Sequence, residues 1–155
     1  MLRDLLLTFH ILGVIAWLGF GIYELFLTHE IRKAKNTPLE VPLLRIYGRY
    51  AGLVALATFV VAIAGGFMAS LLGWGYFKHL WLGIKQIIML AILLDIAYMI
   101  PTFMRTAKAI NELPDSGGPS LDLVRSLLEK VERHVIPMRV GAFIAVLLAV
   151  WRPGA

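Results

Sequence analysis

The chain has 155 residues, of which 59% are hydrophobic, 16% are charged and none is cysteine. A soluble domain of this size is usually less than half apolar, so the composition argues against a water-soluble protein. The lack of cysteine excludes disulfides, thiolate metal sites and covalent c-type haem attachment. The net charge of +5 comes largely from two basic segments between apolar runs, and no nucleic-acid partner is expected.

Four apolar runs predict an all-α, integral membrane four-helix bundle. The predicted spans are residues 5–27, 51–72, 80–103 and 135–151. Each run is long enough to cross about 30 Å of hydrocarbon as a helix, whereas barrel strands are about half as long and alternate in polarity. The first run is too long for the core of a signal peptide and is expected to stay in the membrane. Apolar residues at helical spacing over 120–134 predict an amphipathic cytoplasmic helix that lies on the bilayer or leads into it.

The basic residues predict the orientation of the chain. Two connecting segments carry five Lys or Arg each: Arg32, Lys33, Lys35, Arg45 and Arg49 in one, and Arg105, Lys108, Arg125, Lys130 and Arg133 in the other. The remaining connection and the two ends have only Arg3, Lys78 and Arg152. The positive-inside rule places the two basic segments in the cytoplasm. The single membrane domain, residues 1–155, is therefore predicted to have both its N- and C-termini outside.

The first apolar run has one polar face. His10, Gly13, Trp17, Gly21 and Glu24 recur at steps of three and four residues, which places them along one side of a helix. The opposite side is Leu, Ile and Val. Ionisable residues inside the membrane are costly and almost always face the bundle interior or a cavity. The polar face is therefore predicted to point into the bundle.

The depth of the polar residues suggests two groups. His10 and Lys85 each lie about five residues into a helix that runs from outside to inside, so both are predicted about 8 Å below the outer boundary. The two side chains are expected to line one cavity there. Glu24, Asp95 and Arg139 fall in the inner half, where they are expected to form a charge-compensating cluster.

An imidazole at the depth of His10 has three uses: it ligates haem iron, relays protons, or forms a hydrogen bond between helices. Haem is compatible with the surroundings, because Gly13 and Gly21 let a flat macrocycle approach the backbone and Trp17 can stack on it. Lys85 at the same level can pair with a haem propionate or ligate the iron when neutral. The alternatives stay open: a single intramembrane histidine commonly joins two helices, and Lys85 can snorkel to the interface.

Four short segments together resemble one family. They are residues 9–19 (FHILGVIAWLG), 25–30 (LFLTHE), 81–85 (WLGIK) and 150–153 (VWRP). In order, spacing and topology they resemble the HemJ-type protoporphyrinogen oxidases and the related CopD-like membrane proteins. The resemblance implies haem b as cofactor and the pair His10 and Lys85 as the functional residues.

The leading hypothesis is a haem b-binding redox protein in the cell inner membrane. It would oxidise a small hydrophobic substrate such as protoporphyrinogen IX, or relay electrons within a membrane complex. His10 is the expected metal ligand, His10 and Lys85 are the catalytic pair, and Gly13, Trp17 and Gly21 complete the cofactor pocket. The expected partners are the lipid bilayer, either a quinone or a larger respiratory-type complex, and, as a homo-oligomer, further copies of the chain. The alternatives are a non-enzymatic accessory subunit and a CopD-like copper transporter.

Overall fold

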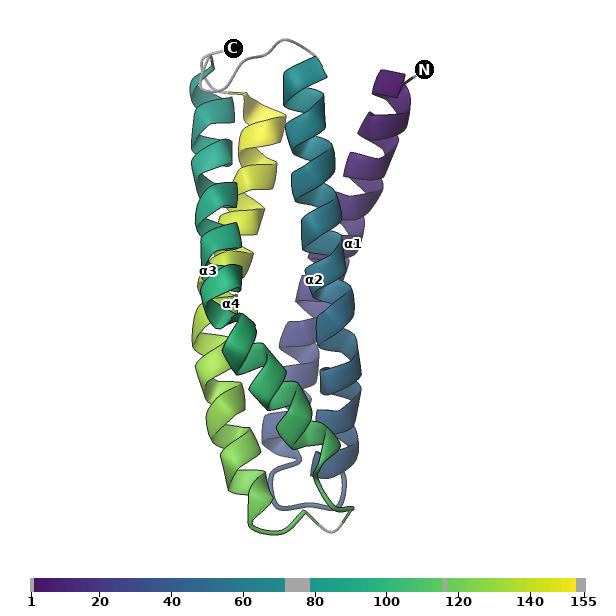
Figure 1. The fold of residues 1–155 in the computed structure, drawn as a ribbon, viewed down its shortest axis with the longest axis vertical. Helices are drawn as coiled ribbons and strands as arrows, with labels where there is room; N and C mark the ends of the chain where they lie inside the picture. Colours follow the sequence, from purple (N-terminus) through teal and green to yellow (C-terminus); the bar gives the residue numbers. More distant parts are fainter. Residues whose placement is uncertain (1, 72–78, 116, 153–155) are drawn as a thin grey trace.

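The structure is a computed structural model that describes residues 2–71, 79–115 and 117–152. These residues form four helices: α1 (Leu2–Lys33), α2 (Glu40–Leu71), α3 (Leu80–Asn111) and α4 (Ser120–Trp151). The helices run up and down along one long axis, and α1 begins at the same end at which α4 ends (Figure 1). The predicted all-α four-helix bundle is confirmed.

All four helices are long and apolar enough to cross a membrane. Large apolar side chains are exposed on every helix, among them Phe26, Phe67, Leu94 and Phe143. Such a surface would be unfavourable in water but is the expected contact surface for acyl chains. The chain is therefore a multi-pass membrane protein.

The helices extend further than the predicted spans. Each has 32 residues, so charged segments that were expected as loops are helical: Arg45 and Arg49 lie on α2, and Arg105 and Lys108 lie on α3. The amphipathic stretch 120–134 and the span 135–151 form one continuous helix, α4. The aromatic residues Trp74 and Tyr76, which we expect near one membrane interface because aromatic rings favour the headgroup level, lie outside the described residues.

The C-terminal half of α3 crosses over towards α2 (Figure 1). Figure 1 shows α3 changing direction along its length, and Pro101 lies inside this helix. Proline removes a backbone hydrogen bond and crowds the preceding turn, so it is a sufficient cause of a bend. The bend brings Ile110 onto α2, where its side chain packs against Gly48.

Two buried apolar clusters hold the four helices together. The cluster at the end of the bundle where α1 ends and α2 begins includes Ile31 of α1, Leu44 of α2, Ile110 of α3 and Val124 of α4. The central cluster consists of Trp17, Val54, Ala57, Val61, Ile92, Met138 and Ala142. Elsewhere α1 packs mainly on α2 and α3 mainly on α4, so the bundle is two helical hairpins joined at these clusters.

Candidate functional site

His10 lies against the backbone of α2. Its Nδ1 atom is 3.2 Å from the carbonyl oxygen of Val61. The ring occupies the space that Gly65 leaves open, because a Cβ atom on Gly65 would lie 3.0 Å from His10 Cε1. In the tautomer that makes this hydrogen bond, Nδ1 donates its proton to Val61 and Nε2 keeps its lone pair. The imidazole is therefore oriented by α2 and retains one nitrogen able to accept a proton or a metal ion.

Lys85, on α3, is partly buried and lies close enough to His10 for its charge to act on the imidazole. The sequence predicted both side chains at one depth, and the structure brings them into the same region. Their assignment as a catalytic pair stays a prediction.

The remaining members of the predicted cofactor pocket make contacts between helices. A Cβ atom on Gly13 would lie 3.0 Å from Val61 Cγ2, and one on Gly21 would lie 2.8 Å from Arg139 Cδ. Trp17 is only 3% exposed and belongs to the central apolar cluster. The spaces beside both glycines are thus taken by neighbouring side chains of α2 and α4, and the role of these three residues around a haem stays a prediction.

The contact between His10 and Gly65 gives a first test. Gly65→Ala is expected to push the imidazole off the Val61 carbonyl, because the added methyl group would stand 3.0 Å from the ring. We expect a loss of about 1–3 kcal/mol in the free energy of unfolding in detergent, from crowding and the broken hydrogen bond. Gly66→Ala is the matched control, since nothing lies within 4 Å of its added Cβ. Equal stabilities of the two variants would contradict this packing.

The half of the bundle that contains the C-terminal part of α1 has a buried ion pair. Arg139 of α4 donates to Glu24 of α1, whose side chain is 6% exposed. The Tyr47 hydroxyl donates to the other carboxylate oxygen at 3.3 Å. Gly21 provides the room that the Arg139 side chain needs. The predicted charge compensation is confirmed for Glu24 and Arg139.

Asp95 has a different partner from the one that the sequence suggested. Its Oδ1 atom is 2.8 Å from Nδ1 of His134, and both side chains are 31% exposed. Sequence reasoning assigned His134 no role in the bundle. Because 120–134 and 135–151 are one helix, His134 lies inside α4 beside α3 and not at the start of a span.

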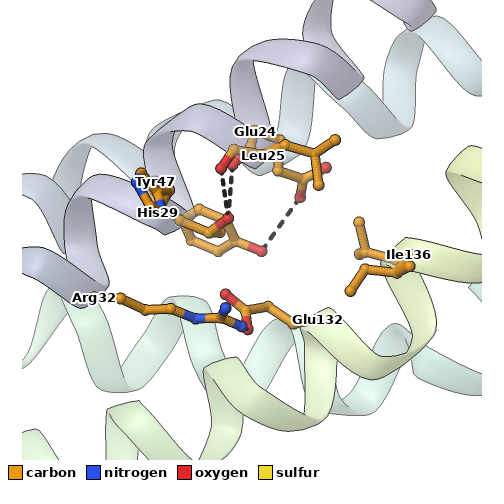
Figure 2. A pocket seen from close by; sticks show the side chains of 9 residues that line it. Glu24, Leu25, His29, Arg32, Tyr47, Glu132 and Ile136 are labelled. Atoms are coloured by element: carbon orange, nitrogen blue, oxygen red, sulfur yellow. Dashed lines mark hydrogen bonds and ion pairs between the residues drawn. The ribbon is translucent and has the colours of Figure 1, made fainter.

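A pocket of about 190 Å³ opens between α1, α2 and α4 near the end of the bundle at which α1 ends and α2 begins (Figure 2). Its lining residues are Glu24, Leu25, Thr28, His29, Arg32, Tyr47, Glu132, Val135 and Ile136. Arg32 pairs with Oε2 of Glu132, as Figure 2 shows. The second oxygen, Oε1, is buried and has no hydrogen-bond partner among the described residues.

Sequence reasoning missed Tyr47 and Glu132 as members of this region. Tyr47 stands between Arg45 and Arg49 in a stretch that reads as a basic loop. Glu132 looks like one more charge on an amphipathic helix. One feature of the sequence did point to Glu132. It lies four residues after Leu128 and eight after Val124, and this helical spacing places it at the edge of their apolar face.

No group of three or more His, Asp or Glu that could hold a metal ion occurs within residues 2–71, 79–115 and 117–152. One axial imidazole suffices for haem iron. No family model, no curated protein and no solved structure matches this chain. The likeness to the HemJ-type and CopD-like proteins therefore stays an expectation that rests on the short segments named above.

Proposed function

We propose that this chain is a haem b-binding redox protein of a bacterial-type inner membrane, with His10 as an axial ligand of the iron. The observation that supports it most is the hydrogen bond from His10 Nδ1 to the Val61 carbonyl. Histidines that ligate metals almost always donate their other ring N–H to a backbone carbonyl or carboxylate, which fixes the tautomer and ring orientation. Nε2 of His10 is the nitrogen left for the iron.

Lys85 suits the same proposal. An ammonium group held in the membrane near His10 is a partner for a haem propionate, whose negative charge would offset the cost of keeping the lysine charged there. Bound haem would supply one-electron redox chemistry. The chain itself would orient the ligand imidazole through Val61 and Gly65 and hold a cation beside the propionate. Two activities follow from this proposal. One is oxidation of a small hydrophobic substrate such as protoporphyrinogen IX, and the other is electron relay to a quinone or a larger complex.

An accessory subunit without catalysis is the second candidate. It is favoured by the contacts of Gly13, Gly21 and Gly65, each of which is covered by a side chain of a neighbouring helix. Small residues at such positions are typical of helix association in lipid. In this case the hydrogen bond of His10 would only join α1 to α2.

An absorption spectrum of the full chain, purified in mild detergent from haem-supplemented cells, tests the proposal. We expect a reduced-state haem b spectrum that disappears in His10→Ala and persists in His29→Ala, whose histidine is exposed at the opposite end of α1. Added imidazole should restore part of the spectrum of His10→Ala by filling the vacated site, which separates loss of a ligand from misfolding. A colourless wild-type protein would reject haem binding, and copper bound in its place would favour the transporter.

A further inference from the structure

The pocket between α1, α2 and α4 has a polar side and an apolar side. Its inner wall is polar and carries Glu24, Tyr47 and Glu132. Leu25 of α1 and Ile136 of α4 also line it, and these two side chains are 47% and 52% exposed on the surface that meets the acyl chains. A molecule bound here would therefore have its polar part in the bundle and an apolar part in the lipid. Amphiphiles dissolved in the membrane have this character.

Glu132 determines which hydrogen-bonding group a ligand of this pocket needs. The residue is 8% exposed and lines the pocket, and Figure 2 shows its carboxylate beside the Arg32 guanidinium. Oε2 accepts from Arg32, whereas Oε1 is buried without a partner. An unsatisfied buried carboxylate oxygen is unfavourable and is nearly always met by a donor. The pocket thus calls for a ligand that donates a hydrogen bond, and a ligand with acceptors alone would leave Oε1 unsatisfied.

The size and lining of the pocket indicate a ring. Its volume is about 190 Å³, somewhat above the cavity of about 150 Å³ that accommodates benzene in another protein. The aromatic rings of Tyr47 and His29 are among its walls, and such rings pack well against a flat partner. A single six-membered ring with small substituents has the appropriate dimensions.

We propose that this pocket binds the headgroup of a membrane quinol, with one quinol hydroxyl donating to Glu132 Oε1. The isoprenoid tail leaves between Leu25 and Ile136 into the bilayer. The proposal concerns binding only and does not depend on haem, because His10 lies in the outer half of α1 and lines no part of this pocket.

The test measures binding of decylubiquinol, kept reduced under anaerobic conditions, to the full chain in lipid nanodiscs. The wild type is expected to bind the quinol at least about tenfold more tightly than decylubiquinone, because the quinone has no hydroxyl to donate. In Glu132→Gln the amide oxygen can face Arg32 and the amide NH₂ the pocket, so the preference should reverse in favour of the quinone. Glu129→Gln, on an exposed position of the same helix, is the matched control and should behave as wild type.

A second variant tests the path of the tail. Leu25→Trp places a large side chain at the lipid-facing side of the pocket and should weaken quinol binding about tenfold. Leu12→Trp, at another exposed position of α1, should not. Wild-type protein that binds neither compound, as it would if only water fills the pocket, overturns the proposal. So does equal affinity for quinol and quinone, or equal affinity for dodecanol, which has a hydroxyl but no ring. The same titration on haem-free His10→Ala protein separates failure of this proposal from failure of haem binding.

Discussion

Arg139→Met is expected to lower the free energy of unfolding by about 3–5 kcal/mol, the cost of leaving a buried carboxylate without its partner. Glu24 is 5% exposed and accepts from both Arg139 and Tyr47. With Arg139 gone, the Tyr47 hydroxyl would be its one remaining donor in the structure, and a neutral donor compensates an ionised group only in part. Unfolding by a denaturing detergent in mixed micelles, followed by circular dichroism, measures the loss.

The double variant Glu24→Leu with Arg139→Met distinguishes a broken pair from lost packing. Both charges are then removed, and the double variant is expected to recover most of the stability that the single variant loses, because a matched apolar pair avoids the cost of desolvation. Arg105→Met, at an exposed position on α3, is the control for loss of a positive charge. If Arg139→Met proves no more destabilising than Arg105→Met, the pair contributes little and the cluster is misassigned.

The fold was predictable from hydropathy, but the helix ends were not. Hydropathy reports which part of a helix lies in lipid, and it contains no information on how far the helix continues into water. Arg45 and Arg49 read as a loop for that reason, although the structure places them on α2. The bend in α3 was equally hidden, because Pro101 shows that a helix is interrupted without showing where its second half goes.

The sequence indicated the depth of each polar side chain in the bundle, but not which neighbouring helix that side chain faces. Glu24 and Arg139 were expected at one level and do pair. Asp95 was expected with them, but its side chain meets His134, because the rotation of α3 about its axis is set by packing that one sequence does not show. Similarly, the sequence does not distinguish Gly65 from Gly66, whereas in the structure a Cβ atom on Gly65 would meet His10 and one on Gly66 would meet nothing within 4 Å.

One buried carboxylate, that of Glu40, joins the turn between α1 and α2 to α4. Glu40, the first residue of α2, is 2% exposed. Its two oxygens accept from Nε and Nη2 of Arg125 at 2.7 Å each, a two-pronged geometry that is among the strongest ion pairs available. It also accepts from the backbone N–H of Asn36 at 2.7 Å, in the turn between α1 and α2. Glu40 therefore ties the first connection of the chain to α4.

These contacts hold the pKa of Glu40 below its reference value of 4.5, chiefly because Arg125 bonds to the charged carboxylate. A carboxyl with a lowered pKa in the folded state stabilises the fold at any pH above the unfolded pKa. The contribution is lost as the pH falls through the lower, folded pKa, where the carboxylate is protonated and releases Arg125. Thermal stability in detergent should accordingly fall as the pH is lowered below about 4.5.

Arg125→Ala is expected to cost about 3 kcal/mol at neutral pH, because Glu40 is then left buried and paired only with Asn36. Glu40→Gln removes the titrating group, so this variant should lose the part of the acid sensitivity that Glu40 causes. Glu129→Gln, at an exposed position on the same helix as Arg125, should keep the wild-type dependence. The measurement is the melting temperature between pH 7 and pH 3 for all four proteins. If the melting temperatures of wild type and Glu40→Gln fall in parallel as the pH is lowered, another carboxylate controls acid unfolding. Protonation of Glu40 would then make no measurable contribution.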